Sequence, residues 1–114
     1  MIRTAPIRYT AHPEQWGRVL RALACTVVQD EPGWAVYAVG AGILRLHGTV
    51  EGHALGATEL WHQTDDAEAA AGRLAGDSGS VTEHPLVEPG TMGWDVAFPD
   101  GRFAGIEPLT PPDV

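Results

Sequence analysis

The chain has 114 residues, 44% of them apolar, and carries 15 acidic against 7 basic side chains, for a net charge of −8. This is the length of one ordinary domain with enough apolar surface for a packed core, and no apolar run is long enough to span a bilayer. All seven basic residues are arginine and form no cationic stripe, so we expect neither nucleic acid nor an anionic membrane as a partner.

Cys25 is the only cysteine, and it lies among Leu23, Ala24, Val27 and Val28. A single cysteine can form neither an internal disulfide nor, without partners, a structural zinc site. We interpret it as a small buried apolar residue, with a catalytic thiol as the less favoured alternative. The first residues also lack the apolar core of a signal peptide, and we therefore expect a cytoplasmic protein.

The first half of the chain predicts a strand, a helix and three more strands. The helix opens at His12-Pro13-Glu14, because a proline in the first turn lacks only an N–H that would have no partner there. Its apolar side chains recur at helical spacing, at Trp16, Val19, Leu20 and Leu23. The strands are predicted at residues 5–10, 26–29, 34–39 and 43–47, with a turn at 40–42 between the last two.

The second half repeats this order. Thr64-Asp65-Asp66 supplies capping side chains, and acidic residues favour the positive end of a helix. The helix is predicted at 67–74, and the strands at 57–63, 80–84, 92–98 and 102–107. The repeat predicts one α+β domain of two βαβββ modules that form a cupped, mostly antiparallel sheet. Its expected parts are module one at 1–48, a linker at 49–56, module two at 57–108 and a loose tail at 109–114.

This order of elements resembles the vicinal oxygen chelate superfamily, which contains glyoxalases, bleomycin-resistance proteins and extradiol dioxygenases. Phe98-Pro99-Asp100-Gly101 resembles the closing Asp-Pro-Asp-Gly segment of that family, with Phe98 where the first aspartate usually stands. Residues 64–70 resemble the start of the family's second helix. Residues 23–46 and 90–92 are similar to the bleomycin-resistance branch in particular. The resemblance covers nearly the whole chain.

The resemblance implies metal-ligand positions on the first and last strands of each module. By offset from the helix starts and the closing glycine, these positions fall on Ala5, Arg45, Glu59 and Gly105. Only Glu59 could coordinate a metal, whereas a divalent ion needs three or more converging oxygen or nitrogen ligands. The five histidines show no zinc-binding spacing either. We therefore expect no metal and no other cofactor, although the resemblance alone would predict a metal enzyme.

Alternation along the predicted strands indicates which side chains line the cup. Glu59 and Trp61 share one face of their strand, so they enter the cup together. Four tryptophans exceed what a small core needs, and aromatic rings suit flat or cationic ligands, although each tryptophan could instead belong to the core. The expected ligand-binding residues are Arg45, Glu59, Trp61, Trp94, Trp34 and Tyr37.

Arg45 and Glu59 occupy neighbouring positions of this implied site, and two roles stay open for them. They form an ion pair that replaces the metal, because a lone buried carboxylate is costly and arginine is its natural partner. Alternatively, Glu59 is a catalytic general base, since a carboxylate in an apolar pocket can titrate near working pH. Arg45 would then stabilise an enolate or a carboxylate.

Three functions are open at this point. The leading hypothesis is a metal-free small-molecule-binding protein that sequesters an antibiotic or another aromatic or cationic metabolite. The second is a metal-independent isomerase, lyase or cyclase with Glu59 as the base. The third is a metal-dependent dioxygenase or lyase whose ligands lie in another register. The resemblance also implies a homodimer, whereas it names neither the ligand nor the choice between binding and catalysis.

Overall fold

A computed structural model describes residues 2–49, 56–77, 80–85, 92–98 and 101–109 of the chain. These residues form a mixed α+β fold with two helices and nine strands. The expected linker and tail fall mostly outside the described residues. Neither described helix is long and apolar enough to cross a membrane.

The first module follows the predicted order, with its first strand divided in two. Pro6 lacks an N–H, so the ladder is interrupted at this point. The neighbouring groups still pair across the interruption, because the Ala5 N–H donates to the Trp61 carbonyl at 2.8 Å and the Pro6 carbonyl accepts from the Arg45 N–H at 2.9 Å. The elements are β1 (Ile2–Thr4), β2 (Ile7–Thr10), α1 (Pro13–Ala22), β3 (Thr26–Glu31), β4 (Trp34–Val39) and β5 (Gly42–Gly48).

The second module repeats strand, helix and three strands. Asp66 supplies the predicted capping, since its Oδ1 accepts the Ala69 N–H at 3.1 Å. The helix continues to Asp77, beyond the end predicted near residue 74. The elements are β6 (Thr58–Thr64), α2 (Ala67–Asp77), β7 (Ser80–Pro85), β8 (Met92–Phe98) and β9 (Gly101–Pro108).

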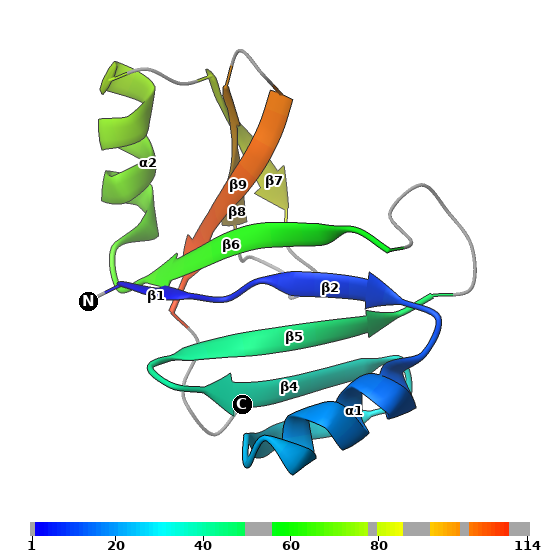
Figure 1. Ribbon diagram of the computed structural model, residues 1–114. Coiled ribbons are helices and arrows are strands. Elements are labelled where there is room, and N and C mark those ends of the chain that lie inside the picture. The colour runs from blue at the N-terminus through cyan, green and yellow to red at the C-terminus, as the bar shows by residue number, and fades with distance from the viewer. Residues whose placement is uncertain (1, 50–55, 78–79, 86–91, 99–100, 110–114) are drawn as a thin grey trace.

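The strands form one sheet in the order β3-β4-β5-β2-β6-β9-β8-β7, with β1 beside β6. Only β2–β5 and β6–β9 are parallel among the described pairs. Each module therefore supplies one half of the sheet, and the halves meet where β2 runs antiparallel to β6. Figure 1 shows the sheet twisting strongly between the two halves, with a helix against each. The predicted α+β fold with two βαβββ modules is confirmed.

Each helix covers an apolar core on the same face of the sheet. Of the stripe predicted on α1, Trp16 and Leu20 pack inward, whereas Val19 and Leu23 are exposed, because the helix meets the sheet along its Leu20 edge and ends at Ala22. Cys25 is half-buried against this core. The α1 core contains Leu20, Ala35, Tyr37 and Leu46, and the α2 core contains Ala67, Val96 and Ile106.

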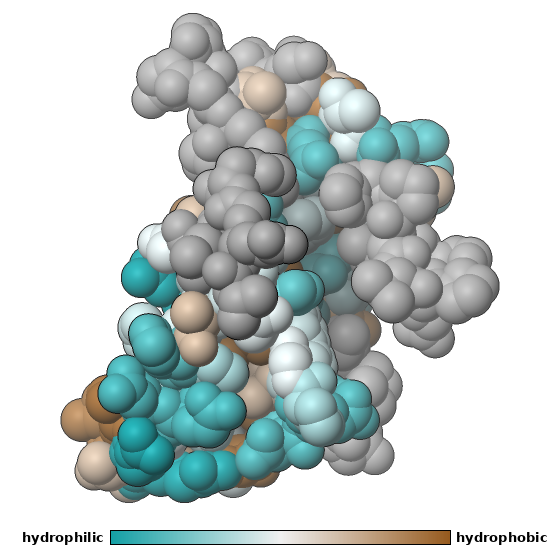
Figure 2. All heavy atoms as spheres, turned by 90° about the vertical axis from the view of Figure 1, so that its right-hand side faces the viewer, coloured by the Kyte–Doolittle hydropathy of each residue, from teal (hydrophilic) through white to brown (hydrophobic). Residues whose placement is uncertain are grey.

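Figure 2 shows the atoms on one side of the molecule, the right-hand side of Figure 1, coloured by hydropathy. Hydrophilic side chains cover most of the lower half, which holds the first module, and hydrophobic ones form separate spots. Scattered exposed apolar side chains are normal for a folded chain. The described residues seen in this view therefore form no continuous apolar patch.

Candidate functional site

Strand alternation and register place several expected site residues on one face of the sheet. Ile7 of β2 pairs with both Arg45 and Glu59, and paired residues point the same way. Trp61 follows Glu59 by two residues and therefore shares its face. Trp34 pairs with His47, which lies two residues after Arg45 on β5. We call the face that carries these side chains, opposite the two helices, the helix-free face.

The structure does not bring Tyr37 or Trp94 to this face. Tyr37 lies an odd number of positions from Trp34 on β4, so its ring enters the core under α1. Trp94 pairs with Ile106 and packs against the core under α2. Four of the residues expected to bind a ligand therefore lie on the helix-free face, namely Trp34, Arg45, Glu59 and Trp61. Tyr37 and Trp94 lie on the side of the sheet that the helices cover.

Arg45 forms a buried ion pair, but with Glu107 rather than with Glu59. Its Nη2 lies 2.5 Å from Glu107 Oε1, and the two side chains are only 8% and 9% exposed. Nη2 and Nε also donate to the Ala5 carbonyl, at 2.5 and 3.2 Å. The predicted Arg45–Glu59 pair is therefore wrong in its partner. The cause is that Glu107 projects from β9 toward the same region of the helix-free face.

The ion pair belongs to a larger buried polar network. Gln63 is fully buried, and its Nε2 donates to Glu107 Oε1 at 3.3 Å. Its Oε1 accepts from Arg3 Nε at 2.8 Å. Removing one member of a buried charge pair leaves the other charge without a partner. Such a network is therefore stable only when each of its polar groups has a hydrogen-bond or ion-pair partner. We call Arg3, Ala5, Arg45, Gln63 and Glu107 the buried network.

The metal-ligand positions implied by the family resemblance do not fit a divalent ion. Gly105 has no side chain, and the Ala5 carbonyl already accepts two hydrogen bonds from Arg45. The Arg45 guanidinium lies directly against Glu107, where a second cation would be repelled. Among the described residues, no three His, Cys, Asp or Glu side chains are grouped so that they could hold an ion.

A row of aromatic side chains crosses the three strands β4, β5 and β2 beside the buried network. The Tyr9 hydroxyl donates to Glu59 Oε1 at 2.8 Å, and the Tyr9 ring lies 5.1 Å from the His47 ring. The His47 ring in turn meets Trp34 edge-on at 6.1 Å. His47 is exposed, and Tyr9, Trp34 and Glu59 are half-buried, so solvent reaches the row. We call Tyr9, His47 and Trp34 the aromatic row, which ends at Glu59.

Trp61 is buried on the same face of β6 as Glu59 and contacts its carboxylate. Its indole Nε1 donates to the same Glu59 Oε1 at 3.3 Å, and the residue is only 4% exposed. Gly105 lies opposite Trp61 on β9, and a Cβ at Gly105 would overlap the indole ring. The glycine at this implied ligand position therefore makes room for the tryptophan that orients Glu59.

Sequence reasoning did not identify Tyr9, Gln63 or Glu107 as site residues. Tyr9 and Glu107 could have been found from strand alternation, because each lies an even number of residues from a position that was assigned to the cup. Alternation predicts the face on which a side chain lies, whereas its partner depends on which distant strands pair and in which register. That second piece of information comes from the sheet register.

Comparison with known proteins supports the fold. No protein-family model and no curated protein matches the chain. A glyoxalase/bleomycin resistance protein/dioxygenase superfamily member from Vibrio splendidus 12B01 is 17% identical, with 93% of this chain and 97% of that chain covered and a TM-score of 0.62.

A second solved structure is described as an NAD-dependent benzaldehyde dehydrogenase from Legionella pneumophila. It is 15% identical, with 94% of this chain and 99% of that chain covered and a TM-score of 0.67. At identities this low, the structural likeness establishes a shared fold and nothing more. The two different names show that this fold does not specify an activity. The chain therefore has the fold of the glyoxalase/bleomycin-resistance/dioxygenase superfamily, which confirms at the level of the fold the resemblance found in its sequence.

Proposed function

We propose that this protein binds an aromatic, cationic small molecule on the helix-free face, without a metal. The observation that carries the proposal is the aromatic row, which leads from Trp34 through His47 and Tyr9 to the carboxylate of Glu59. Partly exposed rings on neighbouring strands offer ring faces and edges to an aromatic ligand, since aromatic pairs meet both offset-stacked and edge-to-face. A carboxylate at the end of the row adds a place for the ligand's positive charge.

Two hydrogen bonds orient the carboxylate of Glu59. The Tyr9 hydroxyl and the Trp61 indole N–H both donate to its Oε1. A cation over an aromatic ring gains about 0.5 to 2 kcal/mol, depending on its desolvation. The net charge of −8 further raises the local concentration of cations around the molecule. These terms all favour a ligand cation over a neutral or anionic molecule.

The other expected residues take different parts in this proposal. Arg45 is engaged with Glu107 and the Ala5 carbonyl, so it stabilises the face rather than contacting the ligand. Trp61 orients Glu59 through its indole hydrogen bond. Sequestration of a toxic ligand, such as an antibiotic, is the biological role that we propose for the binding, and the cytoplasm is its expected location.

A fluorescence titration with a matched pair of probes tests the proposal. N-methylquinolinium is a flat cation, and quinoline is nearly its neutral isostere. We expect N-methylquinolinium to quench tryptophan fluorescence saturably, and Glu59→Gln to weaken its binding about tenfold, which corresponds to about 1.4 kcal/mol. The substitution keeps the acceptor oxygen for Tyr9 and removes the charge, so quinoline binding should not change.

Glu83→Gln is the matched control, because it removes the same charge from an exposed position on β7. It should leave both affinities at the wild-type values. Equal weakening by the two substitutions would show that only total charge matters. Flat traces with both probes would contradict the proposed binding site.

One observation favours the alternative of a metal-independent isomerase, lyase or cyclase. The Tyr9 hydroxyl lies 2.8 Å from Glu59, so a proton donor accompanies the candidate base. Incubation with small ketones and hydroxy acids in D₂O would reveal proton abstraction as deuterium incorporation beside the carbonyl. Glu59→Gln should then abolish the exchange while binding persists, and retained exchange would remove Glu59 as the base.

A further inference from the structure

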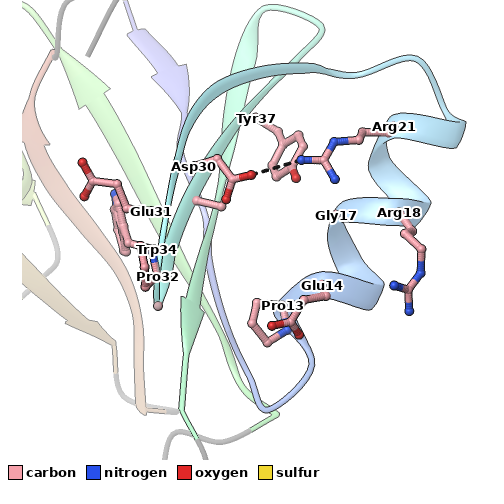
Figure 3. A pocket seen from close by; sticks show the side chains of 12 residues that line it. Pro13, Glu14, Gly17, Arg18, Arg21, Asp30, Glu31, Pro32, Trp34 and Tyr37 are labelled. Atoms are coloured by element: carbon pink, nitrogen blue, oxygen red, sulfur yellow. Dashed lines mark hydrogen bonds and ion pairs between the residues drawn. The ribbon is translucent and has the colours of Figure 1, made fainter.

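Two grooves of different character flank α1 in the described part of the chain. The groove in Figure 3, of about 500 Å³, lies toward the turn between β3 and β4, and Gly17 and Tyr37 are among its lining residues. The carboxylates of Glu14, Asp30 and Glu31 also line it, so it is unfavourable for an anion.

The other groove, of about 370 Å³, lies between α1 and β2, and we call it the donor groove. Its described lining residues are Arg8, Thr10, His12, Gln15, Trp16 and Val19. No acidic side chain is among them. The volume falls within the range of sites that hold small organic ligands, about 300 to 1,000 Å³.

Arg8 brings a guanidinium to the donor groove that no described carboxylate neutralises. Its register partner Leu46 lies in the core under α1, so Arg8 is on the helix side of the sheet, opposite the aromatic row. Its one hydrogen bond in the described residues runs from Nη1 to Thr58 Oγ1, at 3.2 Å. Nε is buried without a partner, whereas Nη2 has no partner and is not buried. Since buried polar groups almost always have partners, this cation is open to an acceptor from outside the chain, which Nη2 can reach.

Trp16 restricts the position of that cation. Arg8 Cζ lies 5.5 Å from the centre of the indole ring, within the range of a cation–π contact. Trp16 is half-buried and packs against the core under α1, so the ring has a fixed support. The indole and the Thr58 hydroxyl therefore hold Arg8 before a ligand arrives, which lowers the entropy that binding would cost.

A closed set of contacts brings the lining side chains around one space. Thr10 lies two residues after Arg8 on the same face of β2 and is only 6% exposed. Its Oγ1 accepts the His12 N–H at 2.9 Å, and the His12 carbonyl accepts the Trp16 N–H at 3.2 Å. Trp16 then meets Arg8, which completes the ring.

His12 and Gln15 add neutral donors to this ring. Both are exposed, and neither side chain makes a hydrogen bond with a described residue. An imidazole N–H and an amide NH₂ can each donate to an oxyanion. Val19 lies one turn after Gln15 on the same side of α1 and adds an apolar edge to the groove.

We propose that the donor groove is a second small-molecule site, which binds an organic phosphate. The phosphate would accept hydrogen bonds from Arg8 Nη2 and from the side chains of His12 and Gln15, since several donors around one space suit an oxyanion with several oxygens. The net charge of −8 opposes an anion at long range, but salt screens exposed charges beyond about 8 Å. The acid next along the helix, Glu14, lines the groove on the other side of α1.

Phenyl phosphate, with phenol as its neutral counterpart, is the probe for this site in ¹⁵N–¹H NMR titrations at constant ionic strength. We expect phenyl phosphate to shift the backbone amide signals of Thr10, Gln15 and Trp16 saturably, and phenol to bind at least tenfold more weakly. N-methylquinolinium should leave these three signals in place. The result is therefore independent of the outcome for the aromatic row.

Arg8→Met keeps most of the apolar stem and removes the charge, so it should lose at least tenfold in phenyl phosphate affinity. Arg18→Met is its matched control, because Arg18 lines the groove on the other side of α1 and removes the same charge. Gln15→Glu changes only an exposed side chain and places a carboxylate in the donor groove, so it should abolish binding in a folded protein.

Unshifted signals in the wild type would overturn the proposal. Wild-type affinity in Arg8→Met or in Gln15→Glu would do the same. Equal losses in Arg8→Met and Arg18→Met would show that only total charge matters, and equal binding of phenol would overturn the phosphate assignment.

Discussion

Arg45 and Glu107 are two opposite charges buried between the modules, and each is tolerable only because of the other. Taking a charge out of water costs several kcal/mol, and the loss is offset by a close partner with further hydrogen bonds. Arginine suits this position better than lysine, because its planar fork reaches Glu107 and the Ala5 carbonyl at once. The buried network thus lies in the region where the family resemblance implies metal ligands, and the positive charge in that region is the Arg45 guanidinium.

Arg45→Met should lower the free energy of unfolding by about 3 to 5 kcal/mol, because Glu107 would be left buried without its cation. Urea denaturation measures the change. The double variant Arg45→Met/Glu107→Leu should recover most of the loss, since both charges are then removed. Arg21→Met serves as the comparison, because its exposed pair with Asp30 is worth about 0 to 1 kcal/mol. Equal costs for the two arginine substitutions would refute a stabilising role for the buried pair.

At the scale of the element, each strand divides its side chains between two different environments. Along β4, Val36 faces the helix-free side with Arg45, whereas Ala35 and Tyr37 enter the core under α1. The same alternation on β6 and β9 places Trp61 and Glu107 together and sends Ile106 to the core under α2. The aromatic residues of the chain therefore have two roles, and the count of tryptophans alone does not distinguish them.

Glycine-to-alanine substitutions in the two helices should have opposite effects on stability. Gly72→Ala should raise the free energy of unfolding by about 0.5 to 1 kcal/mol, because alanine is the better helix former and meets nothing within 4 Å. Gly17→Ala should lower it, since the new methyl group would lie 2.7 Å from the Tyr37 hydroxyl. Thermal denaturation of both variants checks the signs. A gain in stability at Gly17 would show that Tyr37 moves aside without cost.

At the scale of the whole molecule, side chains reinforce the backbone junction between the modules. In the described residues, three Cα pairs join β1 to β6, and two, Ile7 with Glu59 and Arg8 with Thr58, join β2 to β6. The Tyr9–Glu59 hydrogen bond and the Arg45–Glu107 ion pair cross the same junction. Both proposed contacts with a cationic ligand, the aromatic row and Glu59, therefore depend on the modules keeping their relative position.

The homodimer implied by the family resemblance remains a prediction about the assembled protein. Several large apolar side chains are exposed on the single chain, among them Val19 and Leu23 near α1 and Val27 on the edge strand β3. Burying such side chains against a second copy would be favourable. Light scattering on the purified protein should give twice the chain mass of 12.1 kDa. A mass equal to one chain would disprove the dimer.

The sequence by itself determined the order of the elements, the α+β class and the face on which Glu59 and Trp61 lie together. These features follow from local rules, namely the period of two in strands, the period of 3.6 in helices and proline in a first helical turn. The tertiary structure decided that Arg45 pairs with Glu107, that Tyr9 holds Glu59, and that Tyr37 opens into a groove beside Gly17. Such partners are far apart along the chain, and their meeting depends on the register between strands and on how a helix is seated on the sheet, which local periodicity does not specify.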